Sequence, residues 1–202
     1  SAGKKFDYLV GGKVQGFDHQ VRLSEDAPAI IMEGDEYLTS PEDDRPKFLV
    51  YQPHIAVISG IAWDHFNVFP TEADYRAPFE QLVNGMPKAG TILYHQEDKV
   101  VKDIVSTYGD KESYYLSPFK TPDYKIRDGH YEIKLKGDRV PMSVIGRHNM
   151  ANISAAFEVC QLMGVNSQEF LPHISSFRGA GGRLEMIRNE AAGHVVYSDF
   201  DP

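Results

Sequence analysis

Short apolar segments alternate with helical segments in the middle of the sequence, and this alternation limits the possible folds more than any other feature. Apolar runs at 54–61, 90–95 and 113–119 are separated by two helical patterns, one beginning at Thr71 and one covering 97–109. A helix between two strands usually connects parallel neighbours in one sheet. The order therefore predicts an α/β fold with a mainly parallel sheet flanked by helices.

Polar residues mark the expected helix starts, and glycines mark the expected ends. Thr71 followed by Asp74 predicts an N-cap that is close to a capping box. Gly109 is typical of the residue that follows the last turn of a helix, and Gly164 ends a later, alanine-rich helix. Ser167 then caps one more short helix.

Residues 123–144 have a different character from the alternating segment before them. Asp128-Gly129 is a strong two-residue hairpin signal, and a second turn is expected at 136–138. Together they predict a small three-stranded antiparallel sheet attached to the main one. Near the C-terminus, a further strand pair is expected around residues 191–193.

The N-terminal part predicts two strands followed by a third. Ala29–Met32 is a continuous apolar run, as is 54–61, and such runs are typical of strands buried on both faces. The polar stretch 40–48 between them predicts a solvated loop.

Composition and charge narrow the possible functions. The formal charge of the 202 residues is −8, which disfavours nucleic acid or an anionic membrane as a partner. The single cysteine, Cys160, excludes an intrachain disulfide framework and favours a cytoplasmic protein. No apolar run approaches the roughly 20 residues of a membrane helix.

Ionisable residues follow two of the predicted strands. Glu33 comes directly after Ala29–Met32, and Asp64 and His65 follow the run 54–61. Ligands of open parallel sheets bind at the carboxyl ends of the strands, so Glu33 and His65 could share Mg²⁺, which would compensate a buried carboxylate. The alternative is that Glu33 lies at an exposed strand tip and His65 caps or packs against a helix.

Two asparagines stand at the start of the alanine-rich helix. Asn149 and Asn152 are three residues apart, hence on one side of a helix, and His148 precedes them. Asparagine amides match the donor and acceptor edge of adenine. Simple helix capping is the alternative.

A run of small residues, Gly179–Gly182, precedes Arg183. Glycine-rich loops let the backbone approach a phosphate, and arginine binds phosphate through two hydrogen bonds. No Gly-Lys-Ser/Thr sequence of a Walker A motif occurs in the chain.

Taken together, five stretches resemble the Mur ligases, the ATP-dependent amide-forming enzymes of peptidoglycan synthesis. They occur in the order of the family: MEGDEY, ISGIAWDHFNVF, GRHNMANISAA, GAGGRLE and VVYSDF. The resemblance is strongest to the murein peptide ligase branch, with the L-alanine-adding branch as its sister. The resemblance implies that the enzyme uses ATP and Mg²⁺. It also implies that the protein is a cytoplasmic bacterial enzyme of cell wall biogenesis.

Mur ligases have three domains, and the resemblance covers the central ATPase domain without its first strand and P-loop. Residues 1–190 are interpreted as a partial central domain, and 191–202 as its last strand and the start of a linker to a C-terminal domain. The N- and C-terminal domains of the same chain are therefore expected partners.

The resemblance also implies roles for individual residues. Those that match family positions are Glu33 and His65 as catalytic metal ligands, and His148, Asn149, Asn152, Arg183 and Asp199 as ATP-binding residues. Three features depart from the family pattern, and one is Asp201-Pro202, where close relatives continue with a small residue and histidines. Gly182 replaces an arginine that often precedes Arg183, and residues 77–80 lack the modified lysine of some branches.

The implied reaction joins L-Ala-γ-D-Glu-meso-diaminopimelate to UDP-N-acetylmuramate through an acyl-phosphate, in peptidoglycan recycling. The alternatives are UDP-N-acetylmuramate–L-alanine ligation and a catalytically inactive remnant of a nucleotide site. Because the triphosphate-binding loop is missing from the 202 residues, we expect this chain alone to be inactive.

Overall fold

The computed structural model describes residues 3–14, 16–127, 129–181, 185–189 and 194–198. The chain forms two compact units that are each discontinuous in sequence. Unit 1 comprises Ser1–Glu33, Asp123–Gly146 and Ser167–Pro202, and unit 2 comprises Gly34–Pro122 and Arg147–Asn166. No helix in the described ranges is both long and apolar enough to cross a bilayer.

The predicted parallel sheet is present in unit 2. Its strands are β6 (Ile55–Ile58), β7 (Thr91–His95) and β8 (Tyr115–Phe119), in that spatial order and all parallel. The crossovers contain α2 (Glu72–Asn84) and α3 (Lys99–Tyr108), which pack against each other. The alternation of apolar and helical segments is thus confirmed as β-α-β-α-β.

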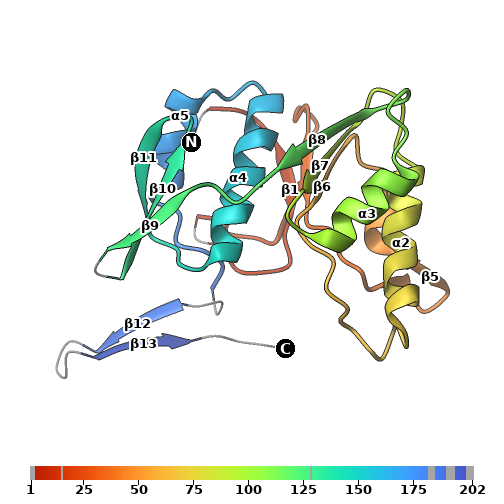
Figure 1. Ribbon diagram of the computed structural model, residues 1–202, viewed down its shortest axis with the longest axis horizontal. Helices are drawn as coiled ribbons and strands as arrows, with labels where there is room; N and C mark the ends of the chain where they lie inside the picture. The colour runs from red at the N-terminus through yellow and green to blue at the C-terminus, as the bar shows by residue number, and fades with distance from the viewer. Residues whose placement is uncertain (1–2, 15, 128, 182–184, 190–193, 199–202) are drawn as a thin grey trace. The chain divides into compact units, whose positions relative to one another are not determined.

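Helices cover both faces of this sheet. Ile92 of β7 belongs to the core that includes Val83 of α2 and Val101 of α3, and all three are fully buried. Leu93 faces the other way and packs with Ala155 of α4 (Arg147–Leu162). Figure 1 shows α2 and α3 on one side of β6–β8 and α4 on the other. The period of two in a strand therefore divides the core into two layers.

The helix starts follow the sequence signals, but one helix end does not. Thr71 and Asp74 form a complete capping box, with Asp74 N donating to Thr71 Oγ1 at 3.2 Å and Thr71 N to Asp74 Oδ2 at 3.1 Å. Gly109 ends α3 in extended backbone, with φ −73°, and not in the left-handed conformation. Glycine is needed there because a Cβ would clash with Val105 O and would lie 2.8 Å from Leu116 Cδ1.

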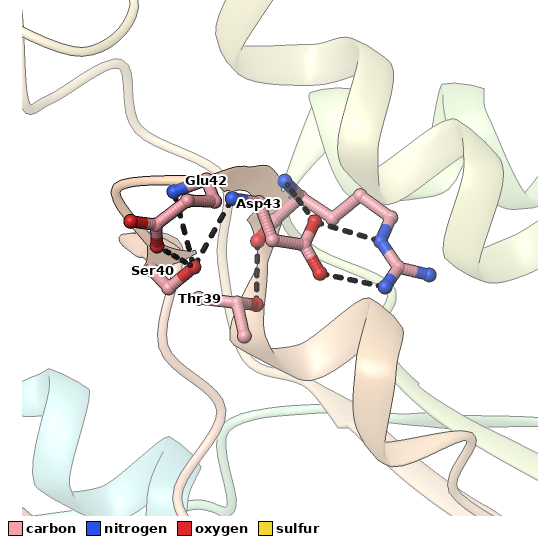
Figure 2. Close-up of polar contacts among 5 residues, drawn as sticks. Thr39, Ser40, Glu42 and Asp43 are labelled. Carbon is pink, nitrogen blue, oxygen red and sulfur yellow. Dashed lines mark hydrogen bonds and ion pairs between the residues drawn. The ribbon is translucent and has the colours of Figure 1, made fainter.

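The expected loop at 40–48 is wrong, because this segment contains regular structure. β4 (Leu38–Ser40) pairs with β5 (Asp43–Pro46), and α1 (Lys47–Tyr51) follows directly. The polar side chains support the hairpin. Ser40 Oγ accepts from the backbone N of Glu42 at 3.2 Å and of Asp43 at 3.1 Å, as Figure 2 shows. The polar composition predicted a loop, but the Ser40 side chain accepts hydrogen bonds from backbone N–H groups of the turn between two strands.

Apolar content also overstated the burial of two strands. The residues of β6 alternate, with Ala56 buried while Ile55 and Val57 are about two-fifths exposed. Val57 is level with Leu93 on the face covered by α4, but α4 packs on β7 and β8 and leaves this face of β6 exposed. In β3 (Ile30–Met32), Ile30 and Ile31 are 45% and 42% exposed. A continuous apolar run does not show which faces are covered.

Unit 1 contains the remaining sheets. β3 is parallel to β1 (Asp7–Leu9), which pairs antiparallel with β2 (Val21–Arg22). The three-stranded antiparallel sheet is confirmed as β9 (Tyr124–Arg127), β10 (His130–Leu135) and β11 (Asp138–Met142). Its expected attachment to the main sheet is wrong, because these strands form a sheet of their own. This unit also contains α5 (Ser167–Ile174) and the antiparallel pair β12 (Glu185–Asn189) and β13 (His194–Ser198), as expected.

The two-layer core predicts a contrast between neighbouring strands. Ile92→Ala should lower the free energy of unfolding by about 2–5 kcal/mol, because it leaves a cavity at a fully buried position. Val57→Ala on the exposed side of β6 should cost less than about 1 kcal/mol. Urea unfolding followed by circular dichroism measures both. Equal losses would contradict the assignment of the core to the helix-covered faces.

Candidate functional site

Glu33 lies at the end of β3 in unit 1, and its carboxylate is exposed. Its backbone N donates to Leu9 O at 2.8 Å, which continues the parallel pairing of β3 with β1. Gly11 N donates to Glu33 Oε2 at 2.5 Å. The hypothesis of a buried carboxylate is therefore wrong, and the alternative of an exposed strand tip describes Glu33, whose carboxylate accepts from a backbone N–H.

Gly11 fits closely against the Glu33 side chain. A Cβ at position 11 would lie 3.2 Å from Glu33 Oε2, so a larger residue would press on the carboxylate. Gln20 Nε2 in turn donates to Gly11 O at 2.8 Å. An exposed carboxylate that is oriented through one oxygen suits Mg²⁺, which takes one or two protein carboxylates and completes its shell with water and phosphate oxygens.

His65 lies in a tight turn after β6 in unit 2. Its φ is +55°, and its carbonyl accepts from Val68 N at 2.8 Å and Phe69 N at 2.9 Å. Asp64 Oδ1 accepts from His65 N at 2.6 Å, and the imidazole packs against the Tyr37 ring with centroids 4.4 Å apart. The ring is half-buried, so the turn and Tyr37 together fix its direction.

The acids that follow Glu33 have partners within unit 2. Asp35 accepts from Lys47 Nζ at 2.6 Å and from Tyr37 N at 2.8 Å. Burial would raise the pKa of the Asp35 carboxyl, but the hydrogen bonds from Lys47 and Tyr37 outweigh it and hold the pKa below its ordinary value. Glu36 Oε1 accepts from the Tyr75 hydroxyl of α2 at 2.8 Å. Both acids therefore tie the residues after β3 to α1 and α2.

A metal shared by Glu33 and His65 stays a prediction. Glu33 belongs to unit 1 and His65 to unit 2. Among the residues that the structure describes, no group of three or more His, Cys, Asp or Glu side chains gathers as a metal site.

The motif at the start of α4 is exposed where a ligand would need it. His148 and Asn152 are exposed and Asn149 is half-buried, whereas Met150 and Ala151 are buried. The helix begins at Arg147, so Asn152 lies inside it and is not a cap. The capping interpretation thus does not account for Asn152, and adenine contact stays a prediction.

The glycine-rich segment is only partly described. Gly179 has φ +87°, and Gly181 N donates to Lys13 O at 2.9 Å, which ties the segment to the N-terminal part of unit 1. Arg183 and Asp199 lie outside the described residues, and their roles stay predictions.

Sequence patterns missed one polar cluster at the carboxyl edge of the parallel sheet. We call it the Glu97 cluster, and it consists of His95, Glu97, Thr121 and Arg147. His95 ends β7, Thr121 follows β8 and Arg147 begins α4, so residues far apart in sequence meet at one carboxylate. The sequence signal was the position of Glu97 and Thr121 directly after two of the predicted strands, and nothing in the sequence pointed to Arg147.

A parallel sheet covered by helices on both faces, with polar groups at its carboxyl edge, defines the class of α/β domains that bind ligands at that edge. Residues 18–160 match the family described as the Mur ligase middle domain, and the chain belongs to this family. The resemblance in the sequence motifs is thereby confirmed.

Similar curated proteins carry ligase names. One is UDP-N-acetylmuramate–L-alanyl-γ-D-glutamyl-meso-2,6-diaminoheptandioate ligase of Haemophilus influenzae, 27% identical over 98% of this chain and 45% of the relative. Another is UDP-N-acetylmuramate–L-alanine ligase of Caldicellulosiruptor bescii, 29% identical over 85% of this chain and 38% of the relative. The chain spans less than half the length of these relatives.

Solved structures agree with the fold. The UDP-N-acetylmuramate:L-alanyl-γ-D-glutamyl-meso-diaminopimelate ligase from Neisseria meningitides superimposes with a TM-score of 0.72 and 25% identity, over 89% of this chain and 59% of that one. MurF ligase from Thermotoga maritima, solved with ADP, gives a TM-score of 0.71 at 12% identity, over 97% of this chain and 47% of that one. At that identity the second likeness shows the fold alone.

The hydrogen bond between Tyr75 and Glu36 predicts a pH dependence. Burial, and next the contact with Glu36, raise the pKa of Tyr75 well above its ordinary value of 10.0. A group whose pKa is raised in the folded state stabilises the protein fully below the unfolded pKa, and this stability is lost as pH rises. Between about pH 9 and 11, the free energy of unfolding of the native protein should fall by roughly 1 kcal/mol more than that of Tyr75→Phe.

Urea unfolding of both proteins across this pH range measures the difference. Tyr115→Phe, at a tyrosine that is 69% exposed, is the matched control and should lose stability with pH as the native protein does. Parallel pH profiles for Tyr75→Phe and the native protein would reject the assignment.

Proposed function

We propose that this chain supplies the ATP- and Mg²⁺-binding part of a ligase that joins a peptide to UDP-N-acetylmuramate. The observation that carries the proposal is the family match over residues 18–160, which includes Glu33, His65 and the motif at 148–152. Relatives whose names specify UDP-N-acetylmuramate as substrate support the same class of reaction.

The proposed nucleotide site combines residues at strand ends and at the start of α4. Glu33 and His65 would hold the metal, His148, Asn149 and Asn152 would contact the adenine end, and Arg183 and Asp199 would contact phosphate and ribose. The exposed carboxylate of Glu33, oriented by Gly11, and the exposed amide of Asn152 support these roles. When bound, Mg²⁺ would offset the negative charge of the triphosphate and of the approaching carboxylate.

The proposed reaction has two steps. The muramoyl carboxylate attacks the γ-phosphorus of ATP, which forms an acyl-phosphate and releases ADP. The amine of the second substrate then attacks the acyl carbon, and phosphate leaves as the amide forms. The residues of this chain bind and orient the nucleotide, so positioning and electrostatics provide the catalysis.

The amine substrate has two candidates. L-Ala-γ-D-Glu-meso-diaminopimelate is favoured by the relative from Haemophilus influenzae, whose match covers 98% of this chain. L-Alanine is supported by the relative from Caldicellulosiruptor bescii, which is 29% identical. Amide formation with each amine, measured under the same conditions, separates the two.

Further parts of the ligase would complete the reaction. The 202 residues contain no Gly-Lys-Ser/Thr sequence to bind the triphosphate, so we propose that this chain alone does not catalyse amide formation. The N- and C-terminal domains of a Mur ligase would bind the UDP-sugar and the amine. We place the ligase in the bacterial cytoplasm, in peptidoglycan recycling.

The metal role of Glu33 predicts a selective loss of activity. In the ligase that contains this domain, Glu33→Gln should lower ADP release with UDP-N-acetylmuramate and the tripeptide by at least about 100-fold, because an amide is a poor ligand for Mg²⁺. The circular dichroism spectrum should not change, because Glu33 is exposed. Glu25→Gln, at another exposed glutamate of unit 1, should keep full activity. Full turnover of Glu33→Gln at saturating Mg²⁺ would reject the assignment.

A further inference from the structure

Four polar contacts converge on one oxygen atom of Glu97. Thr121 Oγ1 donates to Glu97 Oε2 at 2.7 Å, and Thr121 N donates to the same atom at 3.2 Å. The Arg147 guanidinium donates to it at 3.0 Å, and His95 Nε2 lies 3.2 Å away. Chiefly through the Thr121 hydroxyl, these contacts hold the pKa of the Glu97 carboxyl below its ordinary value.

The convergence joins every strand of the parallel sheet to the start of α4. The His95 ring stacks on Phe119, the last residue of β8, with centroids 5.3 Å apart and planes 12° from parallel. Its Nδ1 lies 3.1 Å from Ser59 O, directly after β6. Glu97 therefore links the carboxyl edge of the sheet to Arg147, the first residue of α4.

The geometry points to a role for Glu97 as a positioning residue for the nucleotide. We infer that it fixes the first turns of α4, and through them Asn149 and Asn152, relative to the sheet edge. Asn152 is five residues beyond Arg147, only about 7.5 Å along a helix axis. This inference rests on the proposed function, because it assumes that these asparagines contact ATP.

The body of α4 is held independently of Glu97. Ile153, Ala155 and Phe157 are buried beyond the first turn, and Ala155 packs with Leu93 and Phe119. Loss of the Glu97 contacts should therefore let the first turn shift while the helix stays folded. The Arg147 side chain is 64% exposed, and exposed ion pairs contribute little to the free energy of unfolding. We therefore expect loss of the Glu97 contacts to lower the affinity for the nucleotide and not the stability of the fold.

Steady-state kinetics of the complete ligase test this role. Glu97→Gln keeps the size of the side chain but removes its charge and the strong acceptor. We expect the KM for ATP to rise about 10-fold, with kcat and the KM for UDP-N-acetylmuramate within about twofold of the native values. Glu97→Asp, which keeps the carboxylate, should recover part of the affinity.

A double-mutant cycle tests the route of the effect. Arg147→Met should raise the KM for ATP as well. The KM for ATP of the double variant should not exceed that of the more impaired single variant, because both substitutions remove the same contact. Glu132→Gln removes a carboxylate that accepts from Arg139 Nη1, also at 3.0 Å, within the antiparallel sheet of unit 1. This control should leave all kinetic constants unchanged.

Calorimetric titration with ATP and Mg²⁺ separates this inference from the proposed function. ATP binding that weakens in Glu97→Gln supports the positioning role even if UDP-N-acetylmuramate proves to be the wrong substrate. An unchanged KM and affinity for ATP, additive effects in the cycle, or an equal loss in every kinetic constant would overturn it. If Glu97→Gln does not fold, the KM and affinity for ATP of Arg147→Met, compared with those of the native protein, test the inference. A native ligase that does not bind ATP would overturn both proposals.

Discussion

Burial of β7 between two helical layers is the constraint on which the organisation of unit 2 depends. Ile92 and Leu93 are adjacent in sequence, yet they enter different cores, one with α2 and α3 and the other with α4. The central strand can satisfy both cores only when helices occupy both faces, so the crossover helices α2 and α3 cover one face and α4, from a later segment, covers the other. The polar residues that follow β6, β7 and β8 are thereby brought to one edge.

This edge gathers groups whose chemistry depends on distant parts of the chain. A carboxylate after β7 receives donors from the segment after β8 and from the start of α4, although Glu97 and Arg147 are 50 positions apart in sequence. Asp35 and Glu36 connect the segment after β3 to α1 and α2 in a similar way. The segments that follow Glu33 and precede His148 are thus held by polar contacts that no local motif describes.

The sequence predicted the features that depend on local patterns and missed those that depend on tertiary contacts. Alternating segments identified the parallel sheet, and glycine-containing turns identified the antiparallel one. Apolar runs did not reveal that Ile30 and Ile55 are exposed, because the covering layer is set elsewhere in the chain. For the site, strand ends located Glu33 but not its exposure. The convergence on Glu97 could not be found, because it requires the packing of α4 on the sheet.

The left-handed backbone of His65 favours glycine at this position, whereas the proposed metal site requires the imidazole side chain. At φ +55°, an L-residue with a Cβ costs roughly 1–2 kcal/mol relative to glycine. Glycine at this position would therefore relax the turn that its carbonyl closes with Val68 and Phe69, while removing the imidazole that packs on Tyr37. A selection for thermal stability alone would therefore favour His65→Gly. A selection for amide formation would reject the same substitution if the imidazole binds metal.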